Sequence, residues 1–157
     1  MKRLKIYDIL YNENLCRIKL TIKSSSFLVA LFDKLGKVDI KVKFFAFHQD
    51  VNEILQITFC IEKSELKTAQ KILTEMPLKE KDIQIDPKIG MVAIYGPHFA
   101  EKPGIIDMMH RAVSSQGINI LAISTTVSTS FFIIHSSDVV RAVNCLNETF
   151  EIPRGKV

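Results

Sequence analysis

The stretch INILAISTTVSTSFFIIH, residues 118–135, predicts two β-strands joined by a tight turn. Most of its residues are β-branched or aromatic, and they flank a short polar break, which is the pattern of a hairpin. GMVAIY at 90–95 predicts a strand before the hairpin. Apolar residues recur at helical spacing over 103–117, ahead of the hairpin, and over 137–150, after it. The predicted order is therefore strand, helix, strand, strand, helix.

The same order appears earlier in the chain, where a fourth strand follows. CRIKLTI at 16–22 alternates apolar and polar residues, as a half-buried strand does. The elements after it are predicted, in the order helix, strand, strand, helix and strand, at 26–36, 38–46, 53–62, 64–76 and 82–86. This order is the ferredoxin-like arrangement, and finding it twice strengthens the prediction. The expected fold class is α+β, with two tandem ferredoxin-like βαββαβ modules, each an antiparallel sheet with helices on one face.

We place the first module at residues 12–87 and the second at 88–153. The second module lacks a clear fourth strand, because only Glu151-Ile152-Pro153 separates its last helix from a basic tail. The segment RLKIYDIL, residues 3–10, is a surplus strand ahead of the first module, and we expect it to complete the sheet of the second. The alternative is a frayed amino-terminal arm.

The two copies differ in their loops. Ile18 matches Val92, an offset of 74 residues, whereas alignment of VDI with INI matches Asp39 to Asn119, an offset of 80. The loop before the first helix is therefore expected to be six residues longer in the second copy. Length differences that fall in loops are what duplication of a fold leaves behind.

Composition argues against several classes of function. Lysine and arginine number 21 against 17 acidic residues, and they are spread along the chain, with Arg154 and Lys156 in the tail, rather than clustered as in a nucleic-acid binder. Cys16, Cys60 and Cys145 have no zinc-ligand spacing, so no metal site is predicted. The chain has no signal peptide and no long apolar run. We expect a soluble cytoplasmic protein that binds neither membrane nor nucleic acid.

Catalytic motifs are missing as well. The sequence contains no GxxxxGK phosphate loop and no GxSxG nucleophile elbow. We therefore expect no catalytic residues, no cofactor and no enzyme activity from this chain alone.

The long loop from Gly96 to Gly104 is the best candidate for a binding site. It leads into the amino terminus of a predicted helix, with Pro103 and Gly104 opening it, where free N–H groups and the helix dipole favour a carboxylate. Gly104 lets a ligand approach the backbone closely. Asn119 begins the adjacent strand and can bond both the amine and the carboxylate of an amino acid. We expect no special role for His98 in the loop.

These residues carry a resemblance to a known family. KPG at 102–104, QGINI at 116–120 and AISTT at 122–126 resemble the second ACT domain of aspartate kinases, and residues 4–86 resemble the first with its preceding strand. ACT domains are small-molecule-sensing modules. The resemblance implies a homodimer that binds a feedback effector, lysine or threonine, at an ACT–ACT interface and regulates an amino-acid kinase catalytic subunit. The effector-binding residues that it implies are Lys102, Pro103, Gly104, Ile105, Asn119, Ile120, Ser124 and Thr125.

The first copy departs from the family pattern. Lys23-Ser24-Ser25-Ser26 stands where the family has an Asp-Lys-Pro-Gly-type turn, and Asp39 stands where Asn is usual. The weaker effector-binding candidates in this copy are Ser25, Ser26, Asp39 and Ile40.

Two other functions compete with amino-acid sensing. A module of this kind can dimerise or bind a partner without any ligand. RNA-recognition motifs also have the βαββαβ order, and KVKFFAF at 41–47 mixes basic and aromatic residues, although the RNP-type motif is missing.

Overall fold

The computed structural model describes residues 2–97, 99 and 102–153. His98, Arg154 and Lys156 lie outside the described residues. The chain divides into two compact units. Unit 2 comprises residues 14–88, and unit 1 comprises the described residues of 1–13 and 89–157. Two long strands, β2 (Asp8–Ile22) and β5 (Ile83–Tyr95), contribute one part to each unit.

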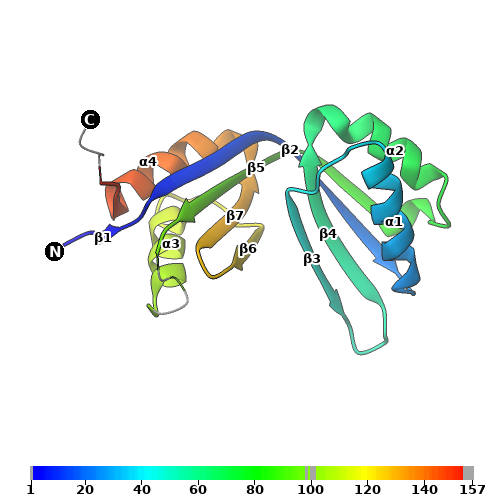
Figure 1. The fold of residues 1–157 in the computed structure, drawn as a ribbon, viewed down its shortest axis with the longest axis horizontal. Coiled ribbons are helices and arrows are strands. Elements are labelled where there is room, and N and C mark those ends of the chain that lie inside the picture. Colours follow the sequence, from blue (N-terminus) through cyan, green and yellow to red (C-terminus); the bar gives the residue numbers. More distant parts are fainter. Residues whose placement is uncertain (1, 98, 100–101, 154–157) are drawn as a thin grey trace. The chain divides into compact units, whose positions relative to one another are not determined.

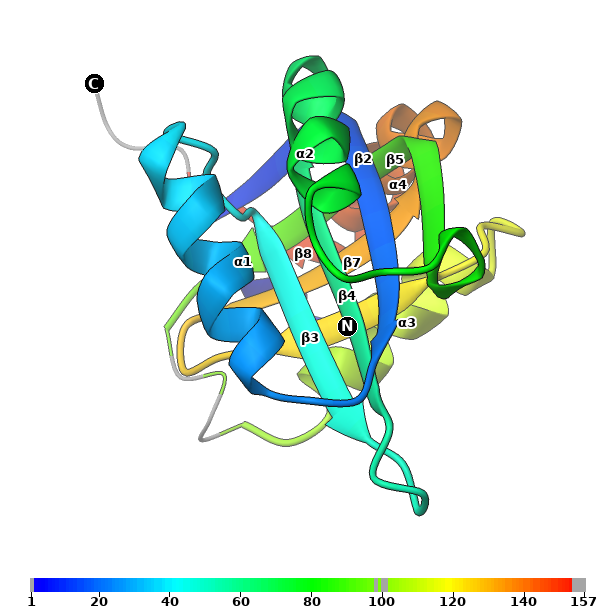
Figure 2. The same ribbon diagram turned by 90° about the vertical axis from the view of Figure 1, so that its right-hand side faces the viewer.

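Unit 2 is a four-stranded antiparallel sheet with two helices on one face (Figure 2). Its strand order is β3-β4-β2-β5. Besides its parts of β2 and β5, the unit contains α1 (Ser26–Lys37), β3 (Phe44–Gln49), β4 (Leu55–Glu62), the 3-10 turn η1 (Lys63–Glu65), α2 (Leu66–Thr74) and the 3-10 turn η2 (Glu80–Asp82). Alternate residues of β2 and β4, such as Ile18 and Phe59, pack beneath Leu31 and Leu35 of α1.

Unit 1 repeats this architecture, with α3 and α4 on one face of a sheet ordered β2-β5-β7-β6 (Figure 1). Its remaining elements are β1 (Leu4–Lys5), α3 (Ile105–Ser114), β6 (Ala122–Thr125), β7 (Thr129–His135), the 3-10 turn η3 (Ser136–Asp138), α4 (Val139–Thr149) and β8 (Phe150–Glu151). Val92, Met109 and Phe132 are fully buried in its core. The predicted α+β class with ferredoxin-like modules is confirmed.

The amino-terminal segment packs within unit 1. Leu4 pairs in parallel with Phe150, and the N–H of Ile6 donates to the carbonyl of Glu151 at 2.9 Å. Ile6 and Ile9 are buried in the core. The segment 3–10 is not one strand, because β1 ends at Lys5 and β2 begins at Asp8.

The second strand of each unit starts later than predicted. β3 begins at Phe44 rather than at residue 38, and β6 begins at Ala122 rather than at residue 118. The cause is a left-handed residue after each preceding helix, Asp39 with φ 57° and Gly117 with φ 70°, which turns the chain away from the helix axis. Several further residues are therefore needed before the chain joins the sheet.

Of the helices in the described residues, none is long and apolar enough to cross a lipid bilayer.

Candidate functional site

Unit 1 has a hollow of about 720 Å³ between the amino terminus of α3 and the β6–β7 hairpin. A volume of several hundred Å³ suits a small ligand. Five of the eight residues predicted for this site line the hollow together, and they are Lys102, Pro103, Gly104, Ile105 and Thr125. Four residues that were not predicted from the sequence line it as well, and they are Phe99, Ile106, Asp107 and Ser130.

Gly104 shapes the entrance to α3. Its φ is 91°, a left-handed conformation that residues with a side chain rarely adopt. Its carbonyl accepts the first helical hydrogen bond, from the N–H of Met108 at 2.9 Å. The helix therefore begins at Ile105 with Gly104 as its cap, and Pro103 precedes the helix rather than opening it.

The floor of the hollow carries a pair of hydroxyl groups. Ser130 is 1% exposed. Among the described residues, it is the single polar residue whose side chain is buried. Its Oγ lies 2.9 Å from Oγ1 of Thr125, directly across the β6–β7 ladder. The Thr125 hydroxyl is also 3.3 Å from the carbonyl of Thr126. Because a buried hydroxyl is costly without a partner, the contact with Thr125 satisfies the Ser130 hydroxyl at the base of the hollow.

Both signs of charge line the hollow. Lys102 lies in the turn before α3, and Asp107 lies in the first turn of the helix. Nε of Arg111 donates to Asp107 at 2.8 Å, one turn along the helix, and both side chains are exposed. The acidic side chain at this helix terminus opposes the dipole's attraction for a second anion. The arrangement therefore fits a ligand with both a positive and a negative group better than it fits a simple anion.

The other three predicted residues do not line the hollow. Asn119 is exposed and precedes β6 by three residues. Ile120 is half-buried against the core of unit 1. Ser124 neighbours Thr125 on β6, and since side chains alternate along a strand, it faces the opposite side of the sheet.

Burial patterns correct the alignment of the two copies. Leu31, Leu35 and Ile40 of unit 2 occupy the places of Met109, Val113 and Ile118 in unit 1, a constant offset of 78 residues. The two left-handed residues, Asp39 and Gly117, have the same offset. The alignment of Asp39 with Asn119 was therefore wrong by two residues. Lys41 is the counterpart of Asn119, and the loop before the first helix is four residues longer in unit 1, not six.

The predicted residues of the first copy are not gathered in one place. Ile40 is buried in the core, whereas Asp39 is exposed in the turn after α1. Ser25 caps α1 without a side-chain hydrogen bond. Ser26 lines a separate hollow in unit 2, where its hydroxyl lies 2.7 Å from that of Ser24.

Unit 2 also lacks the hydroxyl pair. The residues paired at the positions of Thr125 and Ser130 are Phe47 and Ile57, and Ile57 is buried. This difference separates the two copies more sharply than the turn sequences do.

The three cysteines are core residues. Burial raises the pKa of the Cys16 thiol to about 11 and that of Cys60 to about 12, and it also raises the pKa of Cys145. Such thiols are poor nucleophiles because the thiolate is the reactive form. Within the described residues, no group of three His, Cys, Asp or Glu side chains is placed to hold a metal ion.

Comparison with known proteins identifies relatives of this arrangement. Residues 92–150 match the family model described as ACT domain. The chain is 27% identical to Aspartokinase 1 of Bacillus subtilis (strain 168) over 124 residues, which are 79% of this chain and 29% of that protein. Its fold is similar to the ligand-free regulatory subunit of aspartate kinase from Thermus thermophilus, with a TM-score of 0.82 and 22% identity, over 93% of this chain and 99% of that subunit. Aspartate kinase from Synechocystis gives a TM-score of 0.82 at 19% identity, over 97% of this chain and 28% of that chain.

The chain thus spans 29% of the length of the Bacillus relative and nearly all of the Thermus regulatory subunit. The resemblance to the ACT domains of the aspartate kinase regulatory region is confirmed. The solved structures that this chain covers almost completely include two regulatory subunits of aspartate kinase, with 99% of each subunit matched.

Proposed function

We propose that this chain, which is similar to the regulatory regions of aspartate kinases, senses a free amino acid in the hollow of unit 1 and passes that signal to an amino-acid kinase. In this proposal the two ACT domains are residues 12–87 and 88–153, and segment 3–10 completes the second. The observation that carries the proposal is that one hollow is lined both by the oppositely charged Lys102 and Asp107 and by the Thr125–Ser130 hydroxyl pair. A zwitterionic head group and a short polar side chain match these two sets of groups.

Threonine fits this hollow better than lysine does. A threonine hydroxyl can exchange hydrogen bonds with Thr125 and Ser130, and its methyl group can pack against Ile105 or Phe99. A lysine side chain would bring a second ammonium group, whereas Asp107 is the one acidic residue among the described residues that line the hollow. We therefore propose threonine as the first effector to test and lysine as the second.

Asn119 has a place in this proposal at an interface between ACT domains. It is exposed, and its amide can donate to a carboxylate and accept from an ammonium group. A neighbouring ACT domain could bring a ligand within its reach. Ile120 and Ser124 would then support the strand that faces the neighbour, rather than contact the effector directly.

A second copy of the chain is the proposed neighbour. The edge strand β3 exposes aromatic side chains on its helix-facing side, where Phe45 lies 5.1 Å from Phe32 of α1 and 5.9 Å from Phe47, measured between ring centroids. Exposed apolar residues on an unpaired edge are unusual for a monomer. A homodimer formed along this edge would cover them.

A thermal-shift screen of the proteinogenic amino acids, with calorimetric titrations of threonine, lysine and glycine, tests the proposal. Binding to the folded state raises its stability, by about 2.7 kcal/mol when the ligand is at a hundred times its Kd. We expect a saturable shift with threonine that Thr125→Val weakens. Thr74→Val is the matched control, because Thr74 is an exposed helical threonine of unit 2. If no proteinogenic amino acid shifts the melting temperature, the chain is not an amino-acid sensor.

A ligand-free dimerisation module is the second candidate. The Phe32, Phe45 and Phe47 side chains favour it, since a dimer needs no ligand to bury them. Sedimentation of the purified chain, combined with the amino-acid titrations, distinguishes the two. A dimer whose stability responds to no amino acid would establish the module and exclude the sensor.

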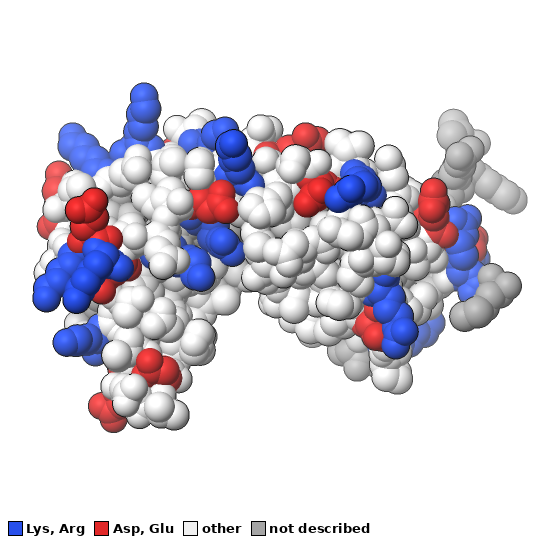
Figure 3. All heavy atoms as spheres, turned by 180° about the vertical axis from the view of Figure 1, so that it is seen from behind, with Lys and Arg blue, Asp and Glu red and all other residues white. Residues whose placement is uncertain are grey.

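RNA binding has less support. RNA-recognition motifs stack bases on the open face of the sheet. Phe45 and Phe47 lie instead on the helix-facing side, opposite Phe59 and Ile57, and Phe44 is buried. On the face of the molecule in Figure 3, basic and acidic side chains are interspersed rather than separated.

A further inference from the structure

The hollow of unit 2 is a separate feature, of about 640 Å³, and it shares no residue with the hollow of unit 1. It lies where the end of β2, the beginning of α1 and the connection between α2 and β5 meet. Residues from positions 21–30 and 76–82 line it, together with Ile54.

Three lysines line this hollow. Lys23 follows β2, while Lys79 and Lys81 lie in the connection after α2. Two other lysines of the unit do have an acidic partner, Lys37 with Asp33 and Lys43 with Glu62. Among the described residues these three form no ion pair, and Asp82 is the one acid in the lining. The first turn of α1 holds no acidic residue either, so the local charge is positive.

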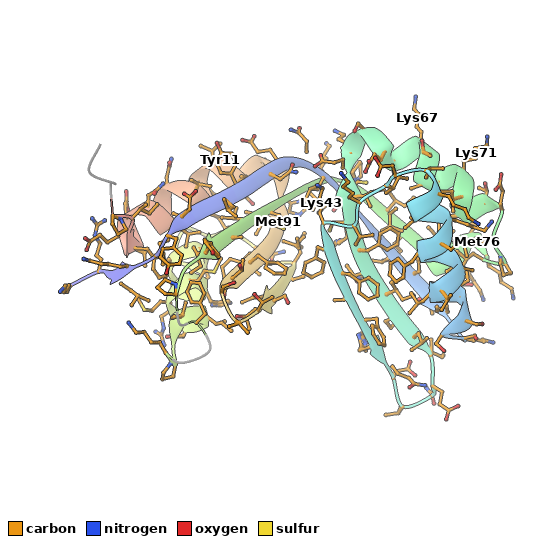
Figure 4. All side chains as sticks on the ribbon, viewed as in Figure 1. Tyr11, Lys43, Lys67, Lys71, Met76 and Met91 are labelled. Carbon is orange, nitrogen blue, oxygen red and sulfur yellow. The ribbon has the colours of Figure 1, made fainter. Side chains whose placement is uncertain are left out.

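The base of the hollow is apolar. Ile22 and Met76 are buried, and Met76 lies just past the end of α2 (Figure 4). Phe27 and Leu78 are partly buried and pack against the same core. Ala30 on α1 leaves room above them, because its side chain is a single methyl group. A hydrocarbon chain can therefore leave water here while its charged end stays near the lysines.

We propose that this hollow binds a small carboxylate with a branched or short apolar chain and no ammonium group, such as a 2-oxo acid. The apolar base accepts the chain, and the lysines attract the carboxylate and repel a ligand's ammonium group. The ligand class differs from the zwitterion proposed for unit 1, where Lys102 and Asp107 offer both charges. The inference goes beyond the proposed function and does not rest on it.

Amide NMR titration of the whole chain tests this inference with three probes. They are ketoisocaproate, leucine, which has the same carbon skeleton with an ammonium group, and inorganic phosphate. We expect ketoisocaproate to give saturable shifts at the amides of residues 23–27 and 76–82. Leucine should bind there at least about tenfold more weakly, because the lysines repel its ammonium group. Equal binding of leucine, or saturation by phosphate alone, would overturn the ligand class.

Two variants separate the contribution of the lysine charges to binding from that of the free volume of the hollow. Lys79→Met with Lys81→Met keeps the length of both side chains and should weaken ketoisocaproate binding about tenfold, the sum of two partly exposed ion pairs. Ala30→Leu keeps the charge and fills the hollow, so it should abolish binding. Lys67→Met is the control, because Lys67 points away from the unit on α2 (Figure 4). Absence of saturable shifts in the parent chain, or unchanged binding in both variants, would refute the site. Neither result bears on threonine binding in unit 1, so failure of one proposal is distinguishable from failure of the other.

Discussion

Oγ of Ser130 lies 2.9 Å from Oγ1 of Thr125, and these two residues face each other across the β6–β7 ladder at the base of a hollow. Unit 2 has Phe47 and Ile57 at the same places. The two units therefore share their fold but offer different groups to a ligand, and the difference lies in the sheet rather than in the loop before the first helix.

Ser130→Ala tests whether the hydroxyl pair contributes to ligand recognition. The variant removes one hydroxyl and leaves that of Thr125, which is exposed and can bond to water. We expect a loss of stability of no more than about 1 kcal/mol. Threonine affinity should fall about tenfold, since a buried hydrogen bond is lost from the complex. An unchanged calorimetric Kd would place the effector elsewhere.

The sequence predicted the fold well where one face of an element is buried. β7 (Thr129–His135) ends where the predicted hairpin ends, at residue 135, because TSFFIIH is a compact run between a turn and a helix. The same run gave no indication that Ser130 lines the hollow. Phe131 and Ile133 lie on one face of the strand, and Phe132 and Ile134 lie on the other. Because both faces are apolar, the sequence shows no alternation of polar and apolar residues that would indicate that Ser130 points into unit 1. The predicted residues that line the hollow, Lys102 to Ile105 and Thr125, came from a contiguous motif and an adjacent strand.

Gly104→Ala should destabilise the chain by about 1 kcal/mol or more, because a side chain is strained at a φ of 91° even though no atom lies within 4 Å of the added carbon. Gly36→Ala is the matched control. Gly36 lies in α1, also with open space around it, and alanine should stabilise the helix there by about 0.5–1 kcal/mol. Urea unfolding measures both. Opposite signs are expected, and stabilisation by Gly104→Ala would contradict the left-handed cap.

Gly90→Ala should destabilise unit 1 by about 1–3 kcal/mol through overpacking. An added Cβ would collide with Cγ2 of Val139 and lie 3.2 Å from the carbonyl oxygen of Asn12. Val139→Ala removes the colliding methyl group, so the double variant should lose less stability than the sum of the two single variants. Additive losses in urea unfolding would show that β5 and α4 do not meet at this point.

Ile6→Ala should cost about 2–5 kcal/mol, the usual range for a large-to-small change in a core. Ile6 is 1% exposed, and its N–H bonds to Glu151 beside the β1–β8 pair. Lys5→Ala is the control, because Lys5 is exposed in the same segment. Deletion of residues 1–11 should have a larger effect than Ile6→Ala. An amino-terminal arm that frays would give no loss in any of these variants.

The buried cysteines should make the chain less stable at alkaline pH. Burial raises the pKa of Cys16 from 9.0 to about 11 and that of Cys60 to about 12, so the folded state holds these protons more tightly than the unfolded state does. Their contribution is fully present below pH 9.0 and is lost as the pH rises toward about 11 for Cys16 and about 12 for Cys60. Urea unfolding across this window should show a decline that Cys60→Ala makes shallower, although Cys60→Ala itself lowers stability at neutral pH.

The native thiols should also resist a thiol reagent until the chain unfolds. Rapid labelling of all three cysteines in the folded chain would contradict their burial and the raised pKa values together.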